Sequence, residues 1–323
     1  MINNRIEILL TLLQSLLVIL LCTFPSSNGS TLSADTAVNA SKPSMESKII
    51  GGTPLSINNA KYQVSLRLVA NENSHGFGYG HDCGGTIITQ RVILTAAHCF
   101  INHNTDPATN RTAGEFTVVV GSSQLYVKEA NMLQYYVQEI VKHAGFNSTT
   151  LINDIGLVFI NGYIPWDWPT AQAIRLNDVI LNFDAPCNVS GWGRNEMGLN
   201  PNNLLYSEVH SISYTNCDAA YGNIPLSMIC AGDFSAGGVG ACYGDSGGPL
   251  ICDDRQVGIV SWGVGCGQAY NPGVYTNVSF YYDWIVEKNR TFDYNLYKNS
   301  SGNLKFSYIP FIIILSFLLF FRQ

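Results

Sequence analysis

Short apolar runs alternate with turn residues along most of the chain, from residue 49 to residue 291. Val, Ile, Tyr and Thr are frequent in these runs and Gly, Asn and Pro separate them, as in "YQVSLRLV", "GTIITQRVIL", "FTVVV", "DIGLVFI", "QVGIVSW" and "GVYTNV". Many short strands with such punctuation are typical of an all-β sandwich or barrel. One helix is expected at the end of this region, where Ser279 can cap "FYYDWIVEK" and Lys288 and Arg290 lie near the C-terminal end of the helix dipole.

Residues 1–29 have the pattern of a secretory signal peptide. The apolar run "ILLTLLQSLLVILL" follows a polar start that contains Arg5, and the small and polar residues "TFPSSNGS" come after it. An uncleaved membrane anchor is the alternative, but the apolar run is short for that role. Residues 30–48 are polar, rich in Ser, Thr and Ala and without cysteine, which predicts a flexible propeptide.

The C-terminal end predicts attachment to the outer face of a membrane. Residues 292–305 are interpreted as a stalk, and residues 306–323 form an apolar tail that is shorter than the ~20 residues of a comfortable membrane span. Ser300, Ser301 and Gly302 precede this tail, as in a signal for a glycosylphosphatidylinositol (GPI) anchor. A lipid anchor is the favoured interpretation; the short spacer and the final Arg322-Gln323 argue against it, and a short spanning helix is the alternative.

Cysteine content agrees with export. Of nine cysteines, Cys22 lies in the signal segment, and the even set that remains predicts four disulfides in an oxidising compartment. No two of them have C-x-x-C spacing, so a zinc ribbon is not expected. Sequons at Asn110, Asn147 and Asn289 can carry glycans. The net charge of −6 argues against a nucleic-acid partner.

The stretch "GDSGGP" contains a candidate nucleophile, Ser246. A serine hydroxyl needs a neighbouring base to take its proton. Glycines on both sides allow a turn that aims the amides of Gly244 and Ser246 at one point, where they would stabilise the oxyanion of an acyl-transfer reaction. The alternative reading is an ordinary glycine-rich turn.

Among six histidines, His98 is the candidate base, because it follows the strand-like run "VILTAA" and precedes Cys99. A general base must be held within hydrogen-bond reach of its partner. The other five histidines are expected to be solvated. Asp154, which leads "NDIGLVFI", is the candidate orienter, because a carboxylate drawn into apolar surroundings needs a donor such as an imidazole N–H. Weaker candidates, in polar or turn-like contexts, are Asp106, Asp167 and Asp178.

These residues lie in motifs that occur in a fixed order: "IIGG" at 49–52, "LTAAHC" at 94–99, "NDIGL" at 153–157, "SGWG" at 190–193, "GDSGGPL" at 244–250, "SWG" at 261–263 and "PGVYT" at 272–276. In this order and spacing the chain resembles the chymotrypsin/trypsin-like serine proteases over residues 49–290. The resemblance implies two packed six-stranded antiparallel β-barrels with a C-terminal helix and a site between the barrels. It also implies a triad of His98 as base and acid, Asp154 as orienter and Ser246 as nucleophile, with Ser261 supporting Asp154.

The same resemblance implies an activation step and a set of disulfides. Cleavage after Lys48 would free Ile49, whose α-ammonium would pair with buried Asp245 and set the Gly244 amide. Removing one partner of a buried ion pair costs roughly 3–5 kcal/mol, so the uncut chain would lack a formed oxyanion hole. Gly156 departs from the alanine that is frequent in the family, and this departure is expected to be tolerated. The implied disulfides are Cys83–Cys99, Cys187–Cys252, Cys217–Cys230 and Cys242–Cys266.

The primary pocket implied by the resemblance carries no charge. Its floor falls at Gly240, the position at which trypsin-like members carry aspartate, and Ala241 follows it. Its walls and entrance are formed by Ser261, Trp262, Gly263 and Gly273. An open uncharged pocket favours Phe, Tyr, Leu or Met before the scissile bond and disfavours an unpaired cation. An elastase-like preference for small residues is the alternative.

The partners follow from this specificity. Protein or peptide substrates are expected, together with a trypsin-like activating protease, because such an enzyme should not cut well after its own Lys48; protein inhibitors are further expected partners. No cofactor or metal is expected, and the loop after Gly121 lacks the carboxylates of calcium-binding relatives. The alternative function is that of a binding protein, a relative of these proteases that has lost catalytic activity. The presence of all three triad residues argues against it.

Overall fold

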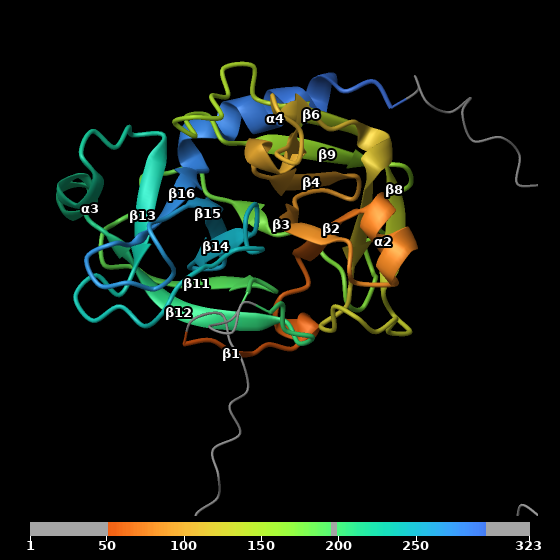
Figure 1. Ribbon diagram of the computed structural model, residues 1–323, viewed down its shortest axis with the longest axis horizontal. Helices are drawn as coiled ribbons and strands as arrows, with labels where there is room; N and C mark the ends of the chain where they lie inside the picture. The colour runs from red at the N-terminus through yellow and green to blue at the C-terminus, as the bar shows by residue number, and fades with distance from the viewer. Residues whose placement is uncertain (1–50, 195–198, 295–323) are drawn as a thin grey trace, which may run out of the picture. The chain divides into compact units, whose positions relative to one another are not determined.

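Two six-stranded antiparallel barrels make up the part of the chain that the computed structural model describes, residues 51–194 and 199–294. The first barrel closes in the order β2-β3-β4-β9-β8-β7 (Figure 1). Its strands are β2 (Gln63–Leu68), β3 (His81–Ile87), β4 (Val92–Thr95), β7 (Phe116–Val120), β8 (Leu133–Lys142) and β9 (Gly156–Ile160). The predicted signal peptide, propeptide, Lys48, Ile49, most of the stalk and the apolar tail lie outside the described residues.

The second barrel closes because β12 pairs with both β11 and β13. Around the ring the order is β12-β11-β14-β15-β16-β13, with β1 added beside β12 and β10 beside β15. The prediction of two six-stranded barrels is therefore confirmed. The strands are β1 (Thr53–Pro54), β10 (Arg175–Leu176), β11 (Pro186–Gly191), β12 (Leu205–Ile212), β13 (Met228–Gly232), β14 (Pro249–Cys252), β15 (Arg255–Trp262) and β16 (Gly273–Asn277).

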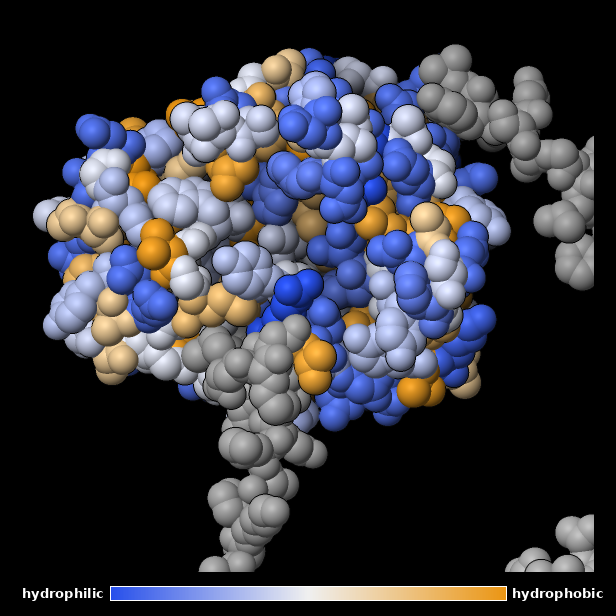
Figure 2. Space-filling model, viewed as in Figure 1, coloured by the Kyte–Doolittle hydropathy of each residue, from blue (hydrophilic) through white to orange (hydrophobic). Residues whose placement is uncertain are grey.

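Burial patterns explain why the strand runs of the sequence are so apolar. β7 and β9 are buried at every position, as expected for strands covered on both faces, whereas β12 alternates buried positions with more exposed ones. The face of the molecule in Figure 2 is mostly hydrophilic, with hydrophobic side chains scattered over it. Within the described residues no helix is long and apolar enough to cross a membrane.

The helical segments are short. They comprise α2 (Val69–His75), α3 (Tyr214–Tyr221), α4 (Tyr282–Thr291) and the 3-10 turns Ile57–Asn59, Ala97–Phe100, Ala113–Glu115 and Ser279–Tyr281. The C-terminal helix was predicted, but the prediction that Ser279 caps it is wrong: a 3-10 turn intervenes, and the Ser279 hydroxyl donates to Asn277 Oδ1 instead. Lys288 and Arg290 do lie in the last turn of α4. Ile285 of this helix packs into the core of the first barrel.

Helix α2 was not predicted, and a buried ion pair joins it to β2. Arg67, 1% exposed, contacts Glu72 at 3.5 Å. Glu72 Oε1 also accepts the amides of Gly78 and Gly80, at 2.8 and 2.9 Å, which folds the loop after α2 back onto the helix. Desolvation of the carboxylate is thus compensated by three donors.

Four disulfides link the described cysteines. They join Cys83–Cys99, Cys187–Cys252, Cys217–Cys230 and Cys242–Cys266, the same pairs that the resemblance implied. Such a set fits an extracellular protein, because disulfides persist in oxidising compartments.

Gly156 is required by a neighbouring aromatic ring. A Cβ at this position would lie 2.4 Å from Cε2 of Phe100. Phe100 is 1% exposed and meets Phe116 edge to face at 5.9 Å, so its ring has little room to move. The glycine that departs from the family pattern is therefore the complement of a bulky residue two positions after His98.

We expect Gly156→Ala to destabilise the protein by about 1–3 kcal/mol, because the added methyl group overpacks the barrel core. Thermal unfolding of the wild type and the variant measures the loss. Gly114→Ala is the matched control, since a Cβ at Gly114 meets nothing within 4 Å. In a Phe100→Leu background the cost of Gly156→Ala should shrink; an unchanged cost would contradict the steric explanation.

Candidate active site

His98 and Asp154 form a close, doubly hydrogen-bonded pair. His98 lies in the 3-10 turn Ala97–Phe100 that follows β4, and Asp154 lies two residues before β9, which pairs with β4. Asp154 Oδ2 accepts from Nδ1 of His98 at 2.7 Å, and Oδ1 accepts from the His98 amide at 2.8 Å. Both the ring and the backbone of His98 are therefore held by one carboxylate, which fixes the tautomer with the proton on Nδ1.

The second barrel completes the environment of Asp154. The Ser261 hydroxyl, at the end of β15, donates to Asp154 Oδ2 at 2.6 Å. The Thr276 hydroxyl of β16 donates to the Asp154 carbonyl at 2.7 Å. With an exposure of 0%, the carboxylate needs these donors to be stable without water. Ser261 thus contacts Asp154 as the resemblance implied.

This arrangement makes the His98 imidazole a stronger base. Burial alone lowers the pKa of His98, but the charge of Asp154 and its hydrogen bond, with a further contribution from Asp82, raise the pKa above the ordinary histidine value. Nε2, the nitrogen that Asp154 does not hold, is left to take up a proton. Its ring is 19% exposed, which leaves it open to a substrate.

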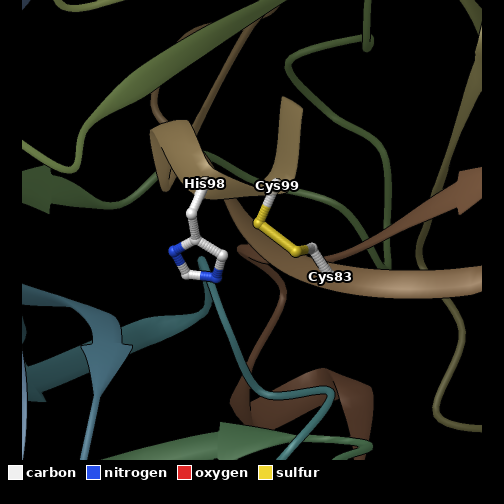
Figure 3. Close-up of side chains that lie close together, drawn as sticks. All are labelled: Cys83, His98 and Cys99. Atoms are coloured by element: carbon white, nitrogen blue, oxygen red, sulfur yellow. A yellow bond between two sulfur atoms is a disulfide. The ribbon is translucent and has the colours of Figure 1, made fainter. Parts of the chain in front are cut away.

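Backbone contacts bring the Ser246 carbonyl to 3.9 Å from Sγ of Cys99, the residue that follows His98. The Ser246 carbonyl accepts the Gly84 amide at 2.8 Å, and Gly84 follows Cys83, which is disulfide-bonded to Cys99. Figure 3 shows the imidazole of His98 next to this disulfide. The grouping of Cys83, His98 and Cys99 also has the spacing of a metal site, but both sulfurs are bonded to each other and are not thiolate ligands.

The peptide groups around Ser246 leave two amides free. The Tyr243 carbonyl accepts the Arg194 amide at 2.6 Å, and the Asp245 carbonyl accepts the Gly248 amide at 2.8 Å. Because a trans peptide points its N–H opposite to its carbonyl, these two bonds fix the directions of the Gly244 and Ser246 N–H groups. Within the described residues neither N–H donates to another backbone or side-chain group. Gly244 has φ +97°, a conformation that other residues rarely adopt.

A cavity of about 190 Å³ opens beside Ser246. Every pocket residue predicted from the sequence lines it: Gly240, Ala241, Ser261, Trp262, Gly263 and Gly273. Added Cβ atoms at Gly240 and Gly263 would have no neighbour closer than 3.6 Å, so the glycines leave the space open.

A family model described as Trypsin matches residues 49–285. Trypsin eta of Drosophila melanogaster is 37% identical over 76% of this chain and 90% of its own length. Trypsin zeta of Drosophila erecta is 35% identical over 84% of this chain and 95% of its own length. Anionic trypsin of Bos taurus is 36% identical over 75% of this chain and 90% of its own length.

The chain belongs to the trypsin family of serine proteases. It is a serine-type endopeptidase that acts on protein substrates.

Two residues of this trypsin-family site were missed by the sequence reasoning. His81 was expected to be solvated, which is wrong: its ring bonds the Ser65 hydroxyl at 2.9 Å and the Gly244 carbonyl at 3.0 Å, beside the candidate oxyanion amides. Burial, with the charge of Arg67, lowers its pKa to about 4, so it stays neutral near pH 7. The sequence offered one indication of this role: His81 lies two residues before the disulfide-bonded Cys83.

Asp233 was also missed, although it lines the cavity. Its Oδ1 accepts the amides of Ser235 and Ala236 at 3.2 and 2.9 Å, and its residue is exposed. The Asp233 carboxylate therefore stabilises the turn that follows it and stays in contact with solvent. It is not a buried charge at the floor of the pocket.

Asp245 is a second buried carboxylate in this protease, with an exposure of 0%. It accepts the amides of Gly193 and Cys242 at 2.7 and 2.9 Å. Burial raises its pKa to about 6, and these two hydrogen bonds offset only part of the effect. Among the residues that the structure describes, no cation forms an ion pair with it.

We therefore expect the full-length chain to lose stability as pH rises from about 4 to 6. Over this range the unfolded state has released the Asp245 proton while the folded state still binds it, so the free energy of unfolding falls, by about 3 kcal/mol in total. Urea unfolding at a series of pH values measures this slope. Asp245→Asn, which keeps the shape and cannot ionise, should flatten it; an equally steep slope in that variant would assign the effect to other groups.

Proposed function

We propose that this endopeptidase uses Ser246 as nucleophile, His98 as general base and acid, and Asp154 as orienter, and that it prefers large apolar residues before the scissile bond. One observation carries the proposal: the buried Asp154 carboxylate accepts hydrogen bonds from His98 Nδ1 at 2.7 Å and from the Ser261 hydroxyl at 2.6 Å. Ser261 and Ser246 both line the adjacent cavity.

The reaction then follows from the positions of the protons. Ser246 Oγ gives its proton to His98 Nε2 as it attacks the scissile carbonyl carbon, and the negative charge on the carbonyl oxygen is stabilised by the amides of Gly244 and Ser246. Imidazolium charge on His98 is stabilised by Asp154. His98 passes its proton to the leaving amine, which leaves an acyl-enzyme on Ser246. Water, deprotonated by His98, cleaves that ester and restores the hydroxyl.

The specificity proposal is supported by the chemistry of the cavity walls. Gly240, Ala241, Gly263 and Gly273 present no charge, so an arginine or lysine side chain would be desolvated without a buried partner. An apolar side chain would gain ~1.5–3 kcal/mol from burial there. A preference for basic residues, as opposed to the elastase-like alternative, would require the exposed carboxylate of Asp233 at the edge of the cavity to turn inward.

A panel of peptide substrates that differ only in the residue before the scissile bond tests the proposal. We expect the processed enzyme to cleave the Phe substrate with at least tenfold higher kcat/KM than the Arg and Ala substrates. Ser246→Ala should lose activity and its labelling by a serine-directed fluorophosphonate; retained labelling would refute the role of Ser246. Absence of activity in the wild type would favour a binding protein.

Two variants sharpen the test. Gly263→Val would narrow the pocket, since a Cβ at Gly263 lies 3.8 Å from Gly273 Cα across it. The Phe substrate should slow strongly while the Ala substrate is retained, and an unchanged Phe rate would contradict the placement of the pocket. If the wild type instead prefers Arg, Asp233→Asn decides whether Asp233 supplies the charge; fastest cleavage of Ala supports an elastase-like enzyme.

Activation is proposed to occur by cleavage after Lys48. The new α-ammonium of Ile49 would pair with Asp245, whose carboxylate is buried beside Ser246 and has a raised pKa. That pair would stabilise the ionised carboxylate and hold the Gly244 peptide. A separate trypsin-like protease would perform the cut, because the pocket disfavours Lys48.

N-terminal sequencing of active enzyme tests this step. The expected first residue is Ile49, and a different start would overturn the proposal. Purified precursor should stay inactive on its own and gain activity after brief treatment with a trypsin-like protease. Efficient self-activation would contradict the proposed need for a separate activator.

Export and tethering are proposed from the chain ends. Residues 1–29 would direct secretion, glycans would occupy sequons such as Asn110 and Asn147, and residues 306–323 would attach the protease to the outer face of the membrane. Release from cells by a phosphatidylinositol-specific phospholipase distinguishes a lipid anchor from a short spanning helix.

A further inference from the structure

Two large aromatic side chains are exposed on the loop that follows β9. Tyr163 is 64% exposed and Trp166 is 71% exposed, whereas Ile164 between them is 2% exposed and packs into the core of the first barrel. Tyr136 of β8, 75% exposed, lies beside this loop, because its carbonyl accepts the Asn161 amide at 2.9 Å. These three exposed rings, of Tyr136, Tyr163 and Trp166, form an aromatic patch on the first barrel.

Internal hydrogen bonds hold the loop of the aromatic patch in this conformation. The Ile164 amide donates to the Gln90 carbonyl at 2.8 Å, and Gln90 Nε2 donates to the Ile164 carbonyl at 3.0 Å. The Tyr163 carbonyl accepts the Tyr135 hydroxyl at 2.9 Å. A fixed backbone therefore presents the rings to water, and an exposed apolar patch of this kind marks an interaction surface.

The chain leaves the described structure beside the aromatic patch. After α4, the ring of Phe292 stacks on that of Phe159 in β9 at 3.7 Å, and the Arg91 guanidinium lies 4.1 Å from the centre of the Tyr294 ring. Arg91 directly follows Gln90, which bonds the loop of the patch. Figure 1 shows the end of α4 beside β9. The first residues of the predicted stalk are thus packed on the same part of the barrel.

The predicted membrane attachment begins a short distance further along the chain. Residues 295–305 separate Tyr294 from the apolar tail at 306–323, and this segment cannot span more than about 40 Å. So short a tether gives the bilayer a high effective concentration at the patch, so a weak contact suffices to hold it there. Tryptophan and tyrosine accumulate at membrane–water interfaces, because each joins an apolar ring to a polar N–H or O–H group.

We propose that the aromatic patch rests on the lipid bilayer, with the rings of Tyr163 and Trp166 in the interfacial region of its outer leaflet. This inference rests on the proposed membrane attachment and adds the face on which the protease lies.

This orientation leaves the active site accessible. Asp154 precedes the first residue of β9, and the loop with Tyr163 and Trp166 follows the last one, so the site and the patch lie at opposite ends of this strand. None of the described residues that line the cavity beside Ser246 belongs to the aromatic patch. A protease docked in this way remains open to extracellular protein substrates.

Quenching of tryptophan fluorescence by brominated phosphatidylcholine tests the inference. The protein, as isolated from cells, is reconstituted by its own tail into vesicles of this lipid and into vesicles of ordinary phosphatidylcholine. The difference in emission between the wild type and Trp166→Phe isolates the fluorescence of residue 166. We expect bromine near the headgroup end of the acyl chains to remove most of this emission.

Phe183→Trp in the Trp166→Phe background is the matched control. Phe183 is 74% exposed and lies in the loop before β11 of the second barrel, so its replacement should not be quenched by the brominated lipid. Quenching at residue 183 and not at residue 166 would overturn the inference. If Trp166→Phe fails to fold, Tyr163→Trp replaces it, and the tryptophan added to the same loop should be quenched.

Flotation of the same vesicles separates the two proposals. Protein that floats with the vesicles while the emission of residue 166 is not quenched overturns the inference and sustains the membrane attachment. Protein that does not float overturns the attachment and, with it, the inference. Emission from residue 166 that is shielded from aqueous acrylamide but not quenched by brominated lipid would assign the aromatic patch to a protein partner, which also overturns the inference.

Discussion

One buried carboxylate, that of Asp154, connects the two barrels at the site. It is held from the first barrel by the ring and amide of His98, and from the second barrel by Ser261, while Thr276 binds its carbonyl. A desolvated charge is tolerated only where several donors converge on it. The same set of hydrogen bonds therefore orients the imidazole and joins the two barrels at the site.

Asp245 is a second buried carboxylate, and fewer hydrogen-bond donors contact it. Its carboxylate accepts two amides, and its raised pKa reflects a charge that is incompletely compensated. The neighbouring loop is otherwise well held, since the Tyr243, Gly244, Asp245 and Ser246 carbonyls each accept a hydrogen bond. Within the described residues, the N–H groups of Gly244 and Ser246 have no hydrogen-bond partner, and the incompletely compensated Asp245 carboxylate lies between them in the sequence.

The sizes of neighbouring side chains decide where this protease has open space. Glycines at 240, 263 and 273 leave the cavity unfilled, and Tyr275 closes part of its wall. Elsewhere the relation is reversed, because Gly156 gives its space to the ring of Phe100. The role of each of these glycines depends on the atoms that surround it in the folded structure.

The sequence by itself determined the strand-rich architecture, because short β-branched runs between turn residues are a local property of the chain. It also indicated Ser246, His98 and Asp154, since the motifs around them are contiguous, and the resemblance carried by those motifs supplied the barrels and the cysteine pairs. The tertiary structure decided the rest: the hydrogen bonds of His81, the ion pair between Arg67 and α2, the turn before α4, and the clash that Gly156 avoids. The physical reason is distance along the chain. Ser261 and Asp154 are 107 residues apart in sequence, and only the closure and packing of two barrels determine which such groups meet and which are left without a partner.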